Sequence, residues 1–272
     1  GKGLALLYLC CSGNCGNYYY NTGAGLFEKK ESQARDEEAK DKIMMGTERK
    51  SLLISDEEKK IIAYHEAGHA LVARFLPNTD AVNKITIIPR GRAAGINWFL
   101  PEESDFKYKD QLESELAVAF GGRVAEEIVF KRISTGAAND IKQATDLANR
   151  MIRSWGMSDD LGPLSYAKGE EQVFLGREIA QHRDYSEATA QKIDQEINKL
   201  IKNSYASAQA VLKENLDILH KLAESLLEKE TVMGKELDAL IQSLRPGIKL
   251  PSKPPEDLET PAESTETAAG QS

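Results

Sequence analysis

The sequence predicts a mainly α-helical protein with a small β-sheet, an α+β fold. Helical periodicity dominates the chain, and segment 187–226 is typical of two long helices rich in Ala, Leu, Ile, Glu and Lys. Convincing strand character is limited to KITIIP (Lys84–Pro89) and GINWFL (Gly95–Leu100). The intervening PRGRAAG segment is typical of a loop, so the two strands are expected to form a short edge hairpin.

The first expected helix carries the motif HEAGH. Ser55 followed by Glu58 is a capping box, which favours a helix beginning at this point. Apolar residues continue at helical spacing to about Leu76. Pro77 is expected to end the helix, because proline lacks a backbone N–H and clashes with the preceding turn.

Three further helices are expected around and beyond the strands. Gln111–Phe130 has a helical pattern that Gly121 and Gly122 should interrupt or bend. Ala138–Trp155 predicts a strongly amphipathic helix, and a shorter helix is expected near Gly234–Leu244. The apolar stripe of the Ala138–Trp155 helix comprises Ile141, Ala144, Leu147, Ala148, Met151, Ile152 and Trp155.

The chain divides into three parts by composition. Residues 1–35 form an irregular leader, residues 36–245 a folded domain, and residues 246–272 an acidic, proline-rich tail that should be disordered. All three cysteines lie in the leader without the partners of a zinc knuckle, so a reducing compartment is expected. They are Cys10, Cys11 and Cys15.

Charge and hydropathy exclude two classes of function. The net charge is −8 and the sequence contains no basic stripe, which argues against nucleic-acid binding. No apolar run approaches the roughly 18–20 residues that span a bilayer, and Gly3–Cys11 is too short. The chain is therefore expected to contain no membrane span.

The HEAGH motif predicts a metal-dependent hydrolytic centre. His65 and His69 are four residues apart, so both imidazoles can point from one helix face at the same ion, and two neutral imidazoles suit zinc. Glu66 lies about 100° around the helix, beside the ion rather than on it. A carboxylate there can act as the general base toward water.

The third ligand stays open on spacing alone. The extended pattern with a third histidine is excluded, because Val72 and Phe75 stand where it needs glycine and histidine. The other two histidines, His182 and His220, are more simply interpreted as surface or hydrogen-bonded residues. A carboxylate is therefore expected. Candidates are Glu126, in the AEEI segment with Glu127, and Asp140, which opens the Ala138–Trp155 helix.

Several motifs in order resemble the peptidase domain of the FtsH family of AAA+ ATP-dependent zinc metalloproteases. The segments are HEAGHALVARFLP, KITIIPRG, GGRVAEEIVF, STGAANDIKQATDLANRMIRSWGMSDDLGPLSY and QVFLGR. The resemblance implies a zincin-like site in which His65, His69 and Asp140 hold zinc. It also implies that Glu66 is the catalytic base and that Glu126 orients a ligand.

The resemblance further implies partners and location. Unfolded or damaged proteins would bind by adding a strand to GINWFL, and the C-terminal helices would build a hexamer. The family is anchored in the inner membrane with the peptidase on the cytoplasmic side. This chain has no phosphate-binding loop of the G-x-x-x-x-G-K-[ST] type, and residues 1–35 match nothing in the family. The expectation is a zinc endopeptidase domain without its motor, or alternatively a non-catalytic assembly module or remnant that joins hexamers of full-length relatives.

Overall fold

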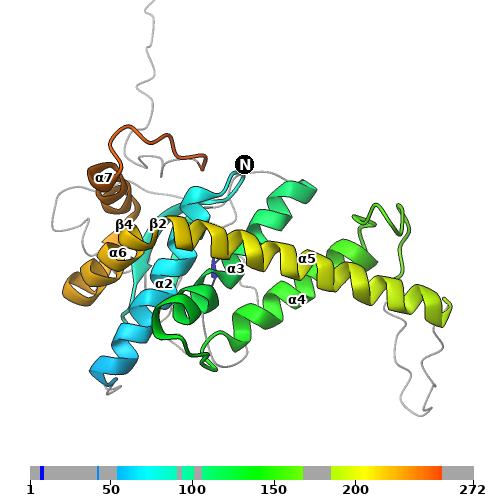
Figure 1. The fold of residues 1–272 in the computed structure, drawn as a ribbon, viewed down its shortest axis with the longest axis horizontal. Helices are drawn as coiled ribbons and strands as arrows, with labels where there is room; N and C mark the ends of the chain where they lie inside the picture. Colours follow the sequence, from blue (N-terminus) through cyan, green and yellow to red (C-terminus); the bar gives the residue numbers. More distant parts are fainter. Residues whose placement is uncertain are drawn as a thin grey trace, which may run out of the picture.

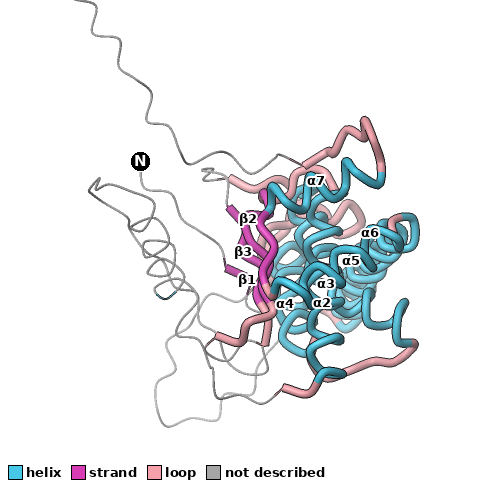
Figure 2. The backbone as a smooth tube through the Cα atoms, turned by 90° about the vertical axis from the view of Figure 1, so that its left-hand side faces the viewer, coloured by secondary structure: helices cyan, strands magenta, loops and turns pink. Residues whose placement is uncertain are grey.

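Helices form the bulk of the molecule, and a small sheet lies along one side of them (Figures 1 and 2). The expected α+β class is confirmed. None of the helices among the described residues is long and apolar enough to cross a membrane. The computed structural model describes residues 7–8, 42, 54–90, 94–100, 106–167 and 185–252.

Helix α2 spans Asp56–Phe75 and carries the HEAGH motif. The expected capping box is present: the Ser55 side chain accepts from the Glu58 backbone N–H, and the Glu58 side chain accepts from Ser55. The helix ends before Pro77, as predicted. Every residue from Ala63 to Arg74 is buried, so α2 forms the centre of the core rather than its surface.

Helix α3 spans Lys109–Phe130 and packs mainly against α2. Gly121 and Gly122 were expected to interrupt or bend this helix, and the interruption is wrong, since the helix continues through both residues. The glycines instead allow close packing. A Cβ at Gly68 of α2 would lie 2.4 Å from the Gly121 carbonyl oxygen, so the two backbones touch where the helices cross.

Helix α4 spans Ala138–Arg153 and packs against α3 and the long α5. In its expected stripe Ala144, Ala148, Met151 and Ile152 are buried and Leu147 is partly buried. The two ends are exposed, Ile141 by 39% and Trp155 by 47%. Trp155 lies beyond the end of the helix, and the Arg150 guanidinium sits 5.9 Å from the centroid of its ring.

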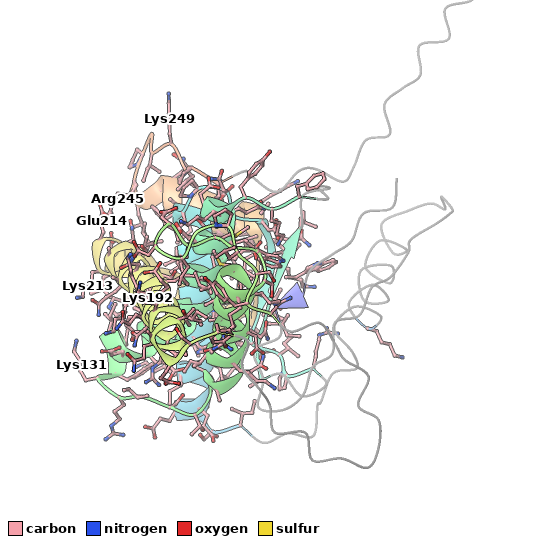
Figure 3. All side chains as sticks on the ribbon, turned by 90° about the vertical axis from the view of Figure 1, so that its right-hand side faces the viewer. Lys131, Lys192, Lys213, Glu214, Arg245 and Lys249 are labelled. Carbon is pink, nitrogen blue, oxygen red and sulfur yellow. The ribbon has the colours of Figure 1, made fainter. Side chains whose placement is uncertain are left out.

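Three C-terminal helices complete the helical body. Helix α5 (Glu187–Glu214) crosses one face of the molecule in Figure 1, and α6 (Leu216–Lys229) follows after Asn215. The shorter α7 spans Gly234–Leu244, as expected. In Figure 3 the labelled charged side chains, Lys192, Lys213 and Glu214 among them, project from the side of the molecule away from the sheet.

The packed domain extends into the first residues of the expected tail. Ser252 is buried and donates its hydroxyl to the carbonyl of Arg74 at 2.8 Å. Arg74 in turn donates to Ser252 and pairs with Asp238 of α7. Of residues 36–53, only Lys42 is among the described residues. The three cysteines and residues 253–272 also lie outside them, so the predictions for these positions stay predictions.

The sheet has the order β1-β3-β2-β4, and all its pairs are antiparallel. Strand β2 spans Ala81–Thr86 and pairs with β3 (Ile96–Leu100), which confirms the hairpin, although β2 begins and ends three residues earlier than predicted. Two strands were not expected: β4 (Thr231–Met233) beside β2, and β1 (Leu7–Tyr8), which lies within the expected leader.

The two residues of β1 pair with part of the outer side of β3, so the expected edge at GINWFL is paired at Asn97 and Trp98. Leu7 faces Trp98 and Tyr8 faces Asn97 in the antiparallel register of β1 with β3. The other side of β3 pairs with β2. A substrate strand on the side of β3 where the resemblance placed it would therefore have to replace the pairing of Leu7 and Tyr8.

Candidate metal centre

The two histidines of HEAGH face one another within the core. Their Nε2 atoms are 3.1 Å apart and the ring centroids 4.7 Å apart, as expected for residues one helical turn apart on one face of α2. Both side chains are almost fully buried. The burial comes from α3, which crosses α2 at the glycine contact and covers this face.

Helix α3 binds the outer nitrogen of each imidazole. His69 Nδ1 lies 2.7 Å from the carbonyl oxygen of Val118, and His65 Nδ1 lies 2.7 Å from Glu126 Oε1. A carbonyl oxygen can only accept, so Nδ1 of His69 carries the proton and its Nε2 is left as the electron-pair donor. This arrangement is the one that orients metal-binding histidines.

Asp140 completes a set of three possible ligands. It lies in the first turn of α4 and is 4% exposed. Its Oδ2 is 3.3 Å from His65 Nε2 and 3.8 Å from His69 Nε2, and the ligand atoms of all three residues lie within 4.8 Å of one another. Tetrahedral zinc with bonds of about 2.0–2.1 Å separates its ligands by roughly 3.3 Å. The donor set and its spacing fit such an ion.

The groups around the two histidines favour one positive charge at this position. Burial lowers the pKa of His65, but hydrogen bonds to Asp140 and Glu126 outweigh it and raise that pKa to about 10. Burial, and then the charge on His65, lower the pKa of His69 to about 4. The carboxylates thus favour one cation between the rings, in the place where a metal ion would lie.

Glu66 lies beside this cluster and contributes no ligand atom to it. The side chain is 1% exposed, and Asn97 Nδ2 of β3 donates to its Oε2 at 2.7 Å. Burial is the main effect on this carboxyl and raises its pKa to about 8, against the opposing effects of His65 and the Asn97 hydrogen bond. A carboxyl with a pKa close to neutrality can both take and release a proton.

The geometry distinguishes the two carboxylates between which spacing could not decide. Asp140 faces both Nε2 atoms, whereas Glu126 binds the outer nitrogen of His65. Glu127, the third acidic candidate, points elsewhere and accepts from the Tyr205 hydroxyl. Asp140 thus lies with the two histidines, and Glu126 lies behind His65.

Of the two remaining histidines, His220 is described, and it lies apart from the cluster. His220 Nδ1 is hydrogen-bonded to the Tyr64 hydroxyl at 2.8 Å on another face of α2, which agrees with the simpler interpretation of this residue. His182 lies outside the described residues.

Three supporting residues were missed from the sequence. Ser134 donates to Glu126 Oε2 at 2.6 Å and so holds the carboxylate that binds His65. Gly122 lies directly against the His65 ring, and a Cβ there would come within 2.5 Å of Cε1. Asn97 was within a predicted strand, where a polar residue flanked by Ile and Trp was the available signal.

Comparison with known protein families places the residues of this centre within one family. Residues 52–240 match the model of peptidase family M41. The chain belongs to the M41 family. The matched range contains every residue of the candidate metal centre.

Individual relatives of the M41 chain carry the name that the motifs indicated. The chain is 51% identical over 207 residues to the ATP-dependent zinc metalloprotease FtsH of Acidobacterium capsulatum, and the match covers 76% of this chain and 32% of the relative. Identity is also 51% over 218 residues to FtsH 1 of Thermomicrobium roseum, covering 80% and 33%. The resemblance to this family is therefore confirmed, and the chain spans about a third of the length of these relatives.

Proposed function

We propose that this chain is a zinc metalloendopeptidase domain that hydrolyses peptide bonds of unfolded or damaged proteins. The observation that carries the proposal is the convergence of His65 Nε2, His69 Nε2 and Asp140 Oδ2 within 4.8 Å, with a buried Glu66 alongside. Membership of the M41 family and the names of the relatives support zinc as the ion.

The roles of the residues follow from their contacts. His65, His69 and Asp140 would hold the zinc, which when bound supplies a Lewis acid able to activate water near neutral pH. Glu126 and the Val118 carbonyl fix the two imidazoles with Nε2 toward the ion. Glu66 takes the proton of the attacking water and returns it to the leaving amine, which suits its raised pKa.

An extended substrate backbone would lie along β3. This strand is next to the base, since Asn97 hydrogen-bonds to Glu66 and a Cβ at Gly95 would come within 2.5 Å of Glu66 Oε1. A peptide pairing with β3 would take the place of β1 and bind through its main chain. Recognition of backbone rather than side chains would suit unfolded proteins of varied sequence.

The test is hydrolysis of denatured casein by the purified chain with zinc and without ATP. Glu66→Gln keeps the shape of the side chain but removes the base, and the rate should fall by about 10²–10⁴-fold. Glu127→Gln is the matched control, because Glu127 binds Tyr205 and not the metal centre. A zinc-loaded, folded chain that leaves casein intact would refute the proposal.

A second function, assembly with copies of itself or with longer relatives, is favoured by the exposed apolar side chains. Trp155 and Ile141 are exposed at the two ends of α4, and Ile133 and Leu164 are exposed in neighbouring loops. Burial of such side chains against a partner lowers the free energy, because it removes apolar surface from water. Light scattering of the chain alone and mixed with a full-length relative would test it: monomers in both samples would reject assembly.

A further inference from the structure

Strand β3 presents a buried amide to the carboxylate that we assign as the general base. Asn97 is 1% exposed, and its Nδ2 donates to the Glu66 backbone carbonyl at 2.9 Å and to Glu66 Oε2 at 2.7 Å. Both protons of the amide nitrogen are therefore used on a single residue of α2. Asn97 ties the side chain of Glu66 to the backbone of Glu66 itself.

The orientation of this amide follows from its partners. The backbone carbonyl of Glu66 can only accept, so the nitrogen and not the oxygen of Asn97 must face it. The opposite orientation would set Oδ1 against two acceptors. In the observed one, Oδ1 is buried and has no hydrogen-bond partner among the described residues. An unpaired buried acceptor disfavours folding, so stability alone does not account for an asparagine here.

The same contacts distinguish the two oxygens of Glu66. Oε2 accepts from Nδ2 and has to remain an acceptor in both protonation states of the carboxyl. The other oxygen, Oε1, lies over Gly95, where any Cβ would come within 2.5 Å of it. The glycine thus leaves space for Oε1, and the asparagine occupies Oε2.

We propose that Asn97 is a positioning residue that holds the Glu66 carboxylate in one orientation, so that Oε1 is the atom that takes the proton from water. This inference rests on the proposed peptidase function. A carboxylate free to rotate would present Oε1 only part of the time, and the reaction requires the correct atom in reach. Asn97 therefore acts on the rate of the chemical step and not on substrate binding.

Two substitutions at Asn97 test the proposal in the zinc-loaded chain. Asn97→Leu has a similar shape, removes the donor and also removes the unpaired acceptor, so folding should be retained. Asn97→Asp has the same shape but places an acceptor against Glu66. We expect kcat on an unfolded substrate to fall about 10–100-fold in both, as for other residues that orient catalytic groups, with KM and bound zinc unchanged.

The control is Asn149→Leu, because Asn149 Nδ2 also donates to a carbonyl, that of Thr145, away from Glu66. A second measurement does not depend on activity: the side-chain ¹⁵N–¹H signals of Asn97 should move in the Glu66→Gln variant and stay in place in Glu127→Gln. Asn97 signals that keep their chemical shifts in Glu66→Gln would overturn the assigned contact.

The kinetic outcomes separate this inference from the proposed function. An active parent chain whose kcat survives either Asn97 substitution overturns the inference alone. An inactive parent chain overturns the peptidase function and this role with it. A fall in kcat with unchanged KM in both folded variants, together with the signal shift, supports the role of Asn97.

Discussion

Replacing Gly122 by alanine places one methyl group directly against the metal centre. A Cβ there lies 2.5 Å from His65 Cε1 and 2.6 Å from each ring nitrogen, about 0.9 Å short of the 3.4 Å at which ordinary contact begins. Metal–ligand distances tolerate only about 0.2 Å. The imidazole must therefore leave its position, and we expect zinc affinity to fall by at least about 10–100-fold, the loss that follows when the support of a ligand is removed.

The same substitution has a calculable effect on stability. Alanine in a helix interior favours folding by about 0.5–1 kcal/mol relative to glycine, whereas overpacking of a core costs about 1–3 kcal/mol. We expect a net loss of about 0.5–2 kcal/mol in urea unfolding of the metal-free chain. In a His65→Ala background the methyl group meets no ring, so the loss should disappear, and the double-mutant cycle isolates this contact.

Zinc affinity is measured by competition with a chromophoric chelator, and the Gly122→Ala chain is compared with the parent chain. Circular dichroism establishes that both are folded before the titration. Wild-type affinity in Gly122→Ala would refute the reasoning, because it would mean that His65 does not bind the ion from its observed position.

Three further predictions concern pH, the core and the sheet. Burial raises the pKa of Glu115 despite Lys107. The stability that this residue contributes is therefore complete below its unfolded pKa and decreases as pH rises through the higher folded pKa. Glu115→Gln should lack this part of the pH dependence of the free energy of unfolding, measured in urea from acid to neutral pH. Tyr64→Phe removes the hydroxyl partner of His220 in a part-buried hydrogen bond and should lower the free energy of unfolding by about 0.5–1.5 kcal/mol. A variant of unchanged stability would contradict this. Tyr8→Pro removes a backbone donor from β1, so casein cleavage should become faster if substrate takes its place on β3, and an unchanged rate would reject that competition.

Local patterns predicted the part of the site that a single helix provides. The capping box and the i, i+4 histidines depend on residues within one or two turns, and α2 formed with the expected bounds. The third ligand could not be chosen that way. Asp140 and Glu126 both lie on helices near buried residues. Only the packing of α3 on α2 and of α4 on α3 determines which oxygen meets Nε2.

Features that depend on distant pairing were missed for the same physical reason. Strand β4 has three residues, too few for an alternating pattern, and it exists because it pairs with β2 almost 150 residues earlier. Gly121 and Gly122 were expected to weaken their helix, since glycine has a low helix propensity. Tertiary contact outweighed that propensity, because only glycine permits α2 and α3 to approach so closely.

All residues assigned to the chemistry lie between His65 and Asp140. They lie on α2, on α3 and β3, which pack against α2, and on α4, which packs against α3. Helix α3 binds both outer nitrogens, Asp140 of α4 faces both Nε2 atoms, and Asn97 of β3 holds Glu66, the proposed base. Each of these contacts is buried in the core of the domain, so the geometry of the centre is coupled to the stability of the α2–α3 crossing.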